Sequence, residues 1–196
     1  MEEIMKKLLL SLVFLSFAAP AYAFRAGSFS LSPTFSYTNS NVDLDNTLFS
    51  GGDSDSTSTS YDIKLGWTTG AGLYLGGLLS VTTSDSSAAS YSPQVTSYGL
   101  SVGYVASNGF YFLGHYFLSS VYDSPVSSTS SFENGSGFQF DLGFLYYFNS
   151  SFALGPQITY RNLSWKKYKS SSTATAVDSS NSVSNIAPQI ALAFTF

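Results

Sequence analysis

Hydrophobic residues alternate with small or polar residues along most of this chain, and this two-residue period restricts its fold more than any other feature. In segment 28–38, for example, phenylalanine, leucine and tyrosine at odd positions alternate with serine and threonine at even positions. A period of two is typical of β-strands with two different faces. The 3.6-residue period of an amphipathic helix is missing from the same segments. The sequence therefore predicts an all-β protein.

Eight such segments follow one another along the chain. They lie at 28–38, 60–67, 73–81, 97–104, 110–118, 138–148, 152–161 and 186–196. Segments of this kind suit the roughly 9–11 residues with which a tilted strand crosses a bilayer. Aromatic residues gather near both ends of the segments, as they do at the two interfaces of membrane barrels.

The connections between the segments alternate in length. Short turns are expected around 69–70, 107–109 and 149–151, whereas long Ser/Thr-rich connections are expected at 40–57, 83–94, 120–136 and 164–184. Eight of the ten acidic residues after position 23 lie in the long connections. Short turns on one side and long loops on the other are typical of a transmembrane β-barrel. We therefore predict an eight-stranded antiparallel up-and-down transmembrane β-barrel.

Composition favours the same class. Only 10% of the residues are charged, against about 25% in typical soluble domains, and a chain that faces lipid needs few charges. The net charge of −4 offers no electrostatic footprint for nucleic acid, and the absence of cysteine excludes disulfides and cysteine-based metal sites. A secreted β-sandwich or lipocalin-like barrel is the competing fold, but it needs a charged exterior, and the less hydrophobic face of these strands consists mainly of Ser, Gly, Ala and Thr.

The first 23 residues have the pattern of an export signal. Lys6 and Lys7 precede an apolar run at 8–19, and Ala21 and Ala23 form an A-x-A cleavage pattern. The apolar run is shorter than a membrane-spanning helix. We therefore expect a cleaved signal peptide at 1–23 and a barrel at 24–196. Two glutamates precede the lysines, which is unusual in such a signal, so Met5 is an alternative start.

The last segment, Ile186 to Phe196, alternates and ends in phenylalanine. It resembles the terminal strand of Gram-negative outer-membrane barrels, and the chain after residue 23 resembles the small eight-stranded barrels of the OmpA/OmpX/OmpW kind. The resemblance implies an outer-membrane location with both termini in the periplasm. It implies that Phe194 and Phe196 form a signal for the barrel assembly machinery. It also implies contact with outer-membrane lipids and lipopolysaccharide, and we expect a monomer.

The inward faces of the predicted strands carry a set of polar residues. This predicted lumen network consists of Asp62, Lys64, His115, Gln139, Asp141, Gln157 and Arg161. Because buried charges must be paired, we expect an ion pair between Asp141 and Arg161, which lie on neighbouring strands. Larger inward residues are expected to fill the rest of the lumen, namely Tyr74, Tyr111, Phe117, Leu145 and Tyr147. The network has two interpretations, a structural plug or a selectivity and binding site.

His115 is the only histidine and therefore the one candidate for acid–base catalysis. It is predicted to point inward and has no matching serine motif, unlike the lipid-modifying hydrolases built on similar barrels. We expect no catalytic site, no metal and no cofactor. The enzyme hypothesis depends on His115 alone.

A basic cluster, Trp165, Lys166, Lys167 and Lys169, is predicted where the seventh strand enters the last long loop. Cationic side chains beside a membrane surface attract phosphate groups, which favours contact with lipopolysaccharide. The alternative is a solvated loop base that balances nearby aspartates. The sequence thus predicts an integral outer-membrane barrel with a plugged lumen, acting as a structural or surface-interaction protein through its loops. The alternative function is a narrow channel for small or hydrophobic solutes.

Overall fold

A computed structural model describes residues 27–42, 54–86, 92–123, 130–171 and 174–196. All regular elements in these ranges are β-strands. They are β1 (Ser28–Val42), β2 (Ser54–Thr68), β3 (Leu73–Ser86), β4 (Gln94–Val105), β5 (Phe110–Asp123), β6 (Ser131–Phe144), β7 (Tyr146–Tyr147), β8 (Phe152–Lys169) and β9 (Val177–Thr195). The predicted signal peptide at 1–23 lies outside the described residues.

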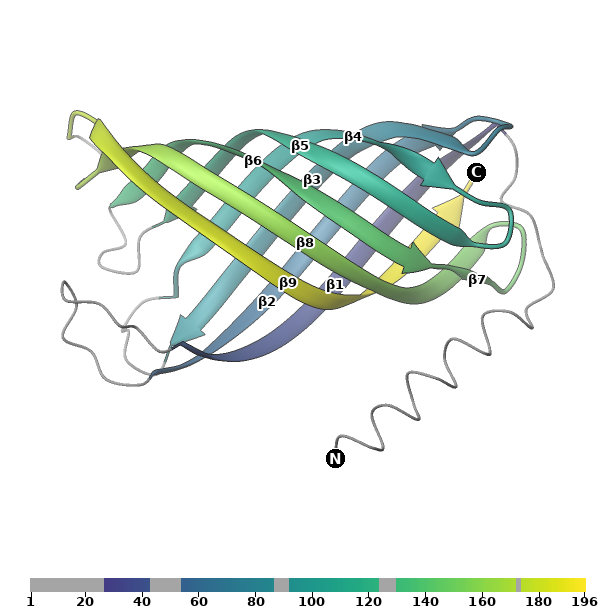
Figure 1. Ribbon diagram of the computed structural model, residues 1–196, viewed down its shortest axis with the longest axis horizontal. Helices are drawn as coiled ribbons and strands as arrows, with labels where there is room; N and C mark the ends of the chain where they lie inside the picture. The colour runs from purple at the N-terminus through teal and green to yellow at the C-terminus, as the bar shows by residue number, and fades with distance from the viewer. Residues whose placement is uncertain (1–26, 43–53, 87–91, 124–129, 172–173) are drawn as a thin grey trace.

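The strands form a closed ring in which each pairs antiparallel with its neighbours (Figure 1). The order runs from β6 through β5, β4, β3, β2 and β1 to β9 and β8, and pairing of β6 with β8 closes the ring. The two-residue β7 follows β6 after a break at Leu145 and pairs with the start of β8. Counting β6 and β7 as one, the wall has eight strands, which confirms the predicted barrel. In the described ranges, no helix is long and apolar enough to cross a membrane.

Tight turns join the strands at one end of the barrel, as predicted. Gly72 and Gly109 take positive φ angles of 88° and 92° at two of these turns, a conformation that glycine adopts without steric cost. At the third, the side chain of Asn149 accepts hydrogen bonds from the backbone N–H groups of Ser151 and Phe152. This end is called the short-turn end below, and the opposite end is the long-loop end.

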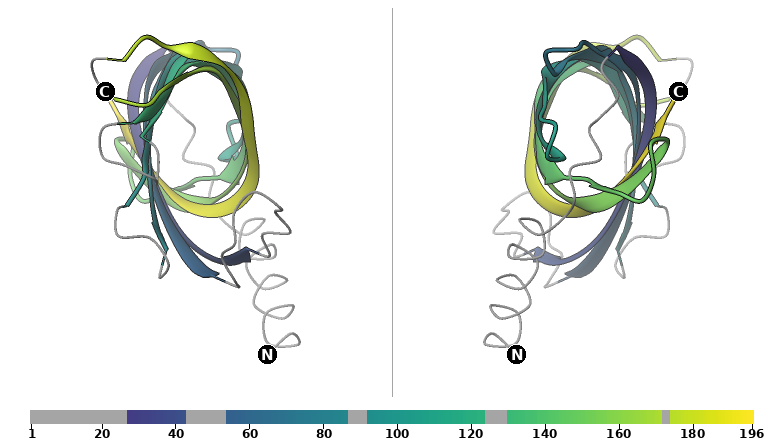
Figure 2. Two further views of the ribbon diagram at one scale, coloured as in Figure 1. Left: turned by 90° about the vertical axis from the view of Figure 1, so that its left-hand side faces the viewer. Right: turned by 90° about the vertical axis from the view of Figure 1, so that its right-hand side faces the viewer.

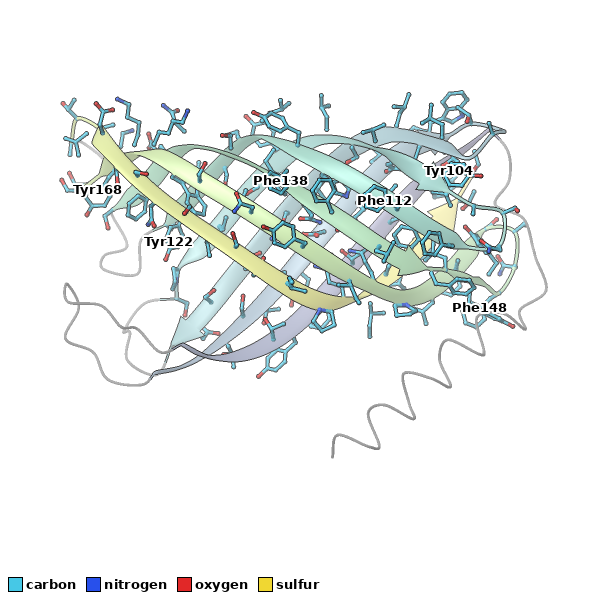
Figure 3. The ribbon with its side chains drawn as sticks, in the orientation of Figure 1. Tyr104, Phe112, Tyr122, Phe138, Phe148 and Tyr168 are labelled. Atoms are coloured by element: carbon cyan, nitrogen blue, oxygen red, sulfur yellow. The ribbon has the colours of Figure 1, made fainter. Side chains whose placement is uncertain are left out.

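Side chains sort by polarity across the barrel wall. Large hydrophobic residues point outward and are exposed, including Leu65 and Leu75 on β2 and β3, Leu100 on β4, and Phe112 and Phe140 on β5 and β6. Figure 3 shows this outer layer along the strands. The inward residues are buried, and many of them are polar or charged. An apolar exterior around a polar interior is the arrangement of a transmembrane β-barrel.

The strands extend farther toward the long-loop end than predicted. The expected connection at 164–184 overlaps β8 and β9, which remain paired from Phe152–Phe194 to Tyr168–Val177. The expected connections at 40–57, 83–94 and 120–136 likewise contain strand ends. Backbone hydrogen bonds do not require alternating hydrophobicity, so Ser/Thr-rich segments continue the ladder above the apolar belt. Those four loop boundaries were therefore wrong.

The seam between β1 and β9 is the shortest joint between two long strands. β1 pairs with β2 over its whole length, but its pairing with β9 ends at Phe35–Ile190 and is interrupted between Leu31 and Thr34. Beyond that point the two strands diverge, and Figure 1 shows the loop ends of β1 and β9 on opposite sides of the barrel. Figure 2 shows the same divergence along the barrel axis.

Candidate functional site: the lumen network

The predicted lumen residues come together in the middle of the barrel. All seven are buried: Asp62, Lys64, His115, Gln139, Asp141, Gln157 and Arg161. Nη2 of Arg161 donates to both carboxylate oxygens of Asp62 at 2.9 and 3.0 Å. Arg161 and Asp62 stand on β8 and β2, which are not neighbouring strands. This ion pair therefore crosses the lumen.

A second ion pair crosses the lumen beside the first. Nζ of Lys64 on β2 contacts the carboxylate of Asp141 on β6, and it also donates to Oε1 of Gln157 at 2.7 Å. Nε2 of His115 lies 3.0 Å from the same Asp141 carboxylate. Two carboxylates thus face one lysine and one arginine, so the site has no net charge when His115 is neutral. Such pairing is the condition under which charges are tolerated in an interior.

Two glutamines connect the ion pairs into one network. Nε2 of Gln139 donates to Asp62 at 3.0 Å and to Asp141 at 2.9 Å, while its Oε1 accepts from Nε of Arg161 at 2.7 Å. Gln157 accepts from Tyr111 Oη and Lys64 and donates to Thr159 and Gln189. The side-chain oxygens and nitrogens of both amides are therefore used. A fully connected polar network holds its members in one arrangement.

The predicted ion pair between Asp141 and Arg161 is wrong. The strand register places Arg161 opposite Gln139, as expected. The lumen is narrow enough, however, for long side chains to reach the far wall. Arg161 therefore pairs with Asp62, and Asp141 pairs with Lys64. Adjacent strands predict which residues share a face, but they do not predict partners across the barrel.

Two hydrophobic clusters enclose the network. Toward the short-turn end the cluster is built of Tyr74, Val105, Tyr111, Leu113, Leu145, Tyr147, Ala153, Ala191 and Ala193. Toward the long-loop end it is built of Leu78, Phe117, Leu163 and Trp165. The five predicted lumen-filling residues are all in these two clusters, and the guanidinium of Arg161 lies 5.8 Å from the ring centroid of Phe117. The charged layer thus lies between two apolar layers.

A small cavity lies between the network and the apolar cluster at the short-turn end. Its volume is about 30 Å³, and its lining includes Thr34, Lys64, Tyr74 and Gln157. The hydroxyls of Thr34 and Tyr74 are buried and have no hydrogen-bond partner in the protein. The lining is mostly apolar, but these hydroxyls and Lys64 are polar partners, and the volume has room for one or two water molecules. We interpret it as a hydration site.

Ser101, His115 and Asp141 form a line of hydrogen-bonded side chains. Ser101 Oγ lies 2.7 Å from Nδ1 of His115, whose Nε2 lies 3.0 Å from Asp141. The residue types are those of acyl-transfer enzymes, and Ser101 was not among the predicted site residues. All three are buried, and neither Ser101 nor His115 lines the small cavity. A nucleophile needs space for its substrate, so this geometry suits a structural hydrogen-bond chain.

The predicted basic cluster separates into inner and outer residues. Trp165 is only 2% exposed and belongs to the apolar cluster toward the long-loop end, so its expected place at the outer surface was wrong. Lys166 is exposed. Lys167 pairs with Asp178 at 2.8 Å and Lys169 pairs with Glu133 at 2.9 Å.

The basic cluster is arranged differently from the prediction because strand β8 continues through this region with Trp165 on its inward side. The lysines therefore stand on a strand and not in a loop. The hydrogen bond from Lys167 lowers the pKa of the exposed Asp178 carboxyl below its ordinary value.

The two phenylalanines of the predicted assembly signal lie at the short-turn end. Phe194 is exposed on the barrel exterior and its ring packs 5.3 Å from that of Phe152. The backbone N–H of Phe196 donates to the carbonyl of Phe29 at 2.9 Å. Both therefore belong to the joint between the first and last strands. Among the described residues, no group of three or more histidine and acidic side chains is placed to hold a metal.

No family model matches this chain, and no curated protein matches it in sequence. Solved structures are similar in fold. The beta domain of the Bordetella autotransporter BrkA is 13% identical with a TM-score of 0.45, over 87% of this chain and 99% of that chain. Neisserial surface protein A is 16% identical with a TM-score of 0.49, over 87% of this chain and 98% of that one. OmpT of Vibrio cholerae is 12% identical with a TM-score of 0.35, over 86% and 52%. These identities are too low to transfer a role to any residue here.

Proposed function

We propose that this protein is an integral outer-membrane barrel whose lumen is closed and which acts through its long-loop end, as a structural or surface-interaction protein. The observation that carries the proposal is the layered lumen. Paired charges at Asp62–Arg161 and Lys64–Asp141 span the barrel, and an apolar cluster lies on either side of them. Transport of small polar solutes needs a continuous polar path, which these layers interrupt. The long-loop end then remains as the working surface.

The exterior supports the membrane location. Outward residues on every long strand of the ring are hydrophobic and exposed, and the charged residues of the lumen are buried. In water such a surface would aggregate, whereas in a bilayer it is solvated by acyl chains. Export through a signal peptide at 1–23, periplasmic termini and a monomeric state complete the proposal. The outward position of Phe194 near the first strand supports its recognition, with Phe196, by the barrel assembly machinery.

Contact with lipopolysaccharide is proposed at a smaller set of residues than the basic cluster contained. Lys166 is exposed, whereas Lys167 and Lys169 already have acidic partners. Lys166 is therefore the residue whose charge is most available to a phosphate group. Replacement of Lys166 by glutamine is expected to reduce lipopolysaccharide co-purification more than the same replacement of Lys167. Equal co-purification of both variants with wild type would contradict this contact.

Single-channel recording in a planar bilayer tests the closed lumen. The refolded protein is expected to leave the bilayer silent. The positive control is the double variant Phe117→Ala with Leu163→Ala, which removes bulk from the apolar cluster toward the long-loop end in order to open the lumen. Heat-modifiable migration on a gel shows that each sample is folded. Reproducible conductance steps from the unaltered protein would contradict the proposal.

A narrow channel is the second candidate function. The observation that favours it is the small cavity, which lies against β1 and β9 and is lined by Ser32 and Leu192. The β1–β9 pairing is interrupted at these residues. A channel would need the charged layer to rearrange, and conductance that depends on Lys64 would support it.

A further inference from the structure

The N-terminal half of β9 has a free edge. The strand runs from Val177 to Thr195, but its pairing with β1 ends at Ile190. On its other side β9 remains paired with β8 as far as Val177. Within the described ranges, β1 and β8 are the only strands that pair with β9. Figure 1 shows β9 and β1 separating toward the long-loop end, so one edge of β9 has no neighbour there.

The alternation of backbone groups identifies the residues of this edge. The N–H of Phe196 donates to the carbonyl of Phe29 on β1, and the backbone groups of every second residue point to the same neighbouring strand. Even-numbered residues of β9 therefore turn their N–H and carbonyl groups away from β8. Those without a partner on β1 are Ile186, Ser184 and Ser182. We call residues 182–188 the open edge.

Side chains along the open edge are exposed on both faces of the strand. Farther along β9, the inward residues Ala187 and Ala191 are buried. Val183 also points inward by alternation, yet it is 48% exposed, and the outward Ile186 is 71% exposed. The barrel wall therefore ends at the open edge, and other molecules have access to it from two sides.

The open edge lacks the features that protect free strand edges in other proteins, which are charges, prolines, bulges and short strands. β9 carries no charged residue after Asp178, and that carboxylate pairs with Lys167. The irregular positions lie only at the limits of the edge, namely Pro188 at one end and a register shift beyond Asn181 at the other. Pro188 has no N–H, so it leaves no unpaired donor where β9 enters the apolar belt.

The chemistry of the open edge indicates its occupant. Backbone donors and acceptors repeat along it at strand spacing, and the side chains of Ser182, Ser184 and Asn185 are polar and uncharged. A small ligand satisfies one or two such groups, whereas an extended polypeptide matches all of them. A second copy in the same membrane has its β9 in the same direction, so two open edges cannot pair antiparallel. We propose that the open edge binds an extended, uncharged segment of a partner protein as an added antiparallel strand.

This inference deepens the proposed surface role and rests on it, because an external partner reaches the open edge only if the long-loop end faces outward. Amide hydrogen exchange of the full refolded chain in phosphocholine micelles tests the edge itself. The amides of Ser182, Ser184 and Ile186 are expected to exchange rapidly, whereas those of Val183 and Asn185, which face β8, exchange slowly. Protection of the three even-numbered amides in the protein alone would overturn the inference, because β1 or a second copy would then occupy the edge.

The probe is a terminally capped peptide with the sequence of residues 34–42, TFSYTNSNV, which has no charged side chain. The seam register, continued past Phe35–Ile190, would place its last valine opposite Val183. Two N-methylated versions form a matched pair. Methyl groups at positions 37, 39 and 41 block the nitrogens that would face β9, whereas those at 36, 38 and 40 block the opposite side.

The unmodified peptide and the version methylated at 36, 38 and 40 are expected to bind. Each should slow exchange of the even-numbered amides at least about tenfold, because the new ladder protects them. The version methylated at 37, 39 and 41 is expected not to bind. Equal binding by the two methylated versions would overturn the inference, and so would a lack of binding by the unmodified peptide.

A pair of variants tests the same contact from the side of the protein. Ser184→Pro removes one donor of the open edge without removing a hydrogen bond to β8, and Ser184→Ala keeps that donor. The proline variant is expected to bind the peptide about tenfold more weakly than the alanine variant. Each variant is first shown to be folded by its heat-modifiable migration. Equal affinity of the two folded variants would overturn the inference.

Two further results separate this inference from the proposed function. Peptide binding by the purified protein, but not by intact cells that carry it in the outer membrane, supports the open edge and contradicts the outward direction of the long-loop end. A silent bilayer together with no peptide binding overturns this inference alone, whereas conductance together with peptide binding removes only the closed lumen.

Discussion

Arg161 and Asp62 join opposite walls of the barrel through two hydrogen bonds from one guanidinium nitrogen, at 2.9 and 3.0 Å. β8 and β2 are separated in the ring by β9 and β1. The pair therefore spans the strands on both sides of the weakest joint in the wall. Because β1 and β9 share few backbone pairs, interactions across the lumen hold this side of the barrel together.

Replacement of Arg161 by leucine is expected to destabilise the barrel by about 3 kcal/mol, because it leaves the buried Asp62 carboxylate without its cation. The double variant Arg161→Leu with Asp62→Leu removes both charges and is expected to regain most of that loss. Equilibrium urea unfolding in lipid vesicles, followed by tryptophan fluorescence, measures both. A double variant whose loss equals the sum of the two single losses would contradict the coupling.

Phe117 is expected to contribute through packing. It is fully buried, belongs to the apolar cluster toward the long-loop end and lies against the guanidinium of Arg161. Phe117→Ala should cost about 3–5 kcal/mol in the free energy of unfolding, as for other large-to-small changes in cores. Unfolding in the same vesicles measures the cost. Leu118→Ala is the control, because Leu118 points outward and is exposed, and its replacement should cost much less.

A glycine under a tyrosine ring provides a test of lumen packing. At Gly66 a Cβ would be 2.4 Å from Cζ of Tyr74 and 2.7 Å from the carbonyl oxygen of Leu75. Gly66→Ala must therefore displace the ring and the backbone, and we expect a cost of about 1–3 kcal/mol. At Gly77 the nearest atom to a Cβ is the Gly99 carbonyl oxygen at 3.6 Å, so Gly77→Ala should be tolerated. Similar unfolding midpoints for the two variants would contradict this account.

The sequence was enough to predict the barrel because alternation, turn length and low charge all follow from the same physical requirement. A strand in a bilayer must be apolar on one face and must have its backbone paired. The inward direction of the Asp62, Lys64 and Arg161 side chains followed from the two-residue alternation along their strands. Their partners did not, since partners across the lumen depend on the tilt and width of the closed ring.

Strands that are longer than predicted, together with bulges, explain the larger errors. Parity predicts side-chain direction only while the register is regular, and each inserted residue reverses it. Trp165 was placed outside because the polar residues after it suggested a loop, although the strand continues to Lys169. Tyr122 and Phe132 were assigned to a long connection for the same reason. The ring contacts of Tyr122 with Trp165 and with Phe132 were therefore not predictable from alternation.

The β1–β9 seam should be the first part of the wall to open, because proline interrupts it on both strands. The backbone N–H of Phe196 donates to the carbonyl oxygen of Phe29 across the seam. The backbone groups of every second residue in a strand point to the same neighbouring strand, so positions 33 on β1 and 188 on β9 also face the seam. Both positions are proline. Proline has no N–H, which removes a ladder hydrogen bond at each position. The pairing of β1 with β9 is interrupted around Pro33 and ends before Pro188.

Hydrogen exchange measures this opening. The amide protons of Phe35 and Ile190 are expected to exchange faster than that of Ile63, which lies in continuous ladders of β2 with β1 and β3. Pro188→Val supplies an N–H that faces β1 and should slow the exchange of Phe35 severalfold. Pro156→Val is the control, because by the same parity residue 156 turns its amide toward β6. If Pro156→Val slowed exchange at Phe35 as much as Pro188→Val does, the missing seam hydrogen bond would not be the cause.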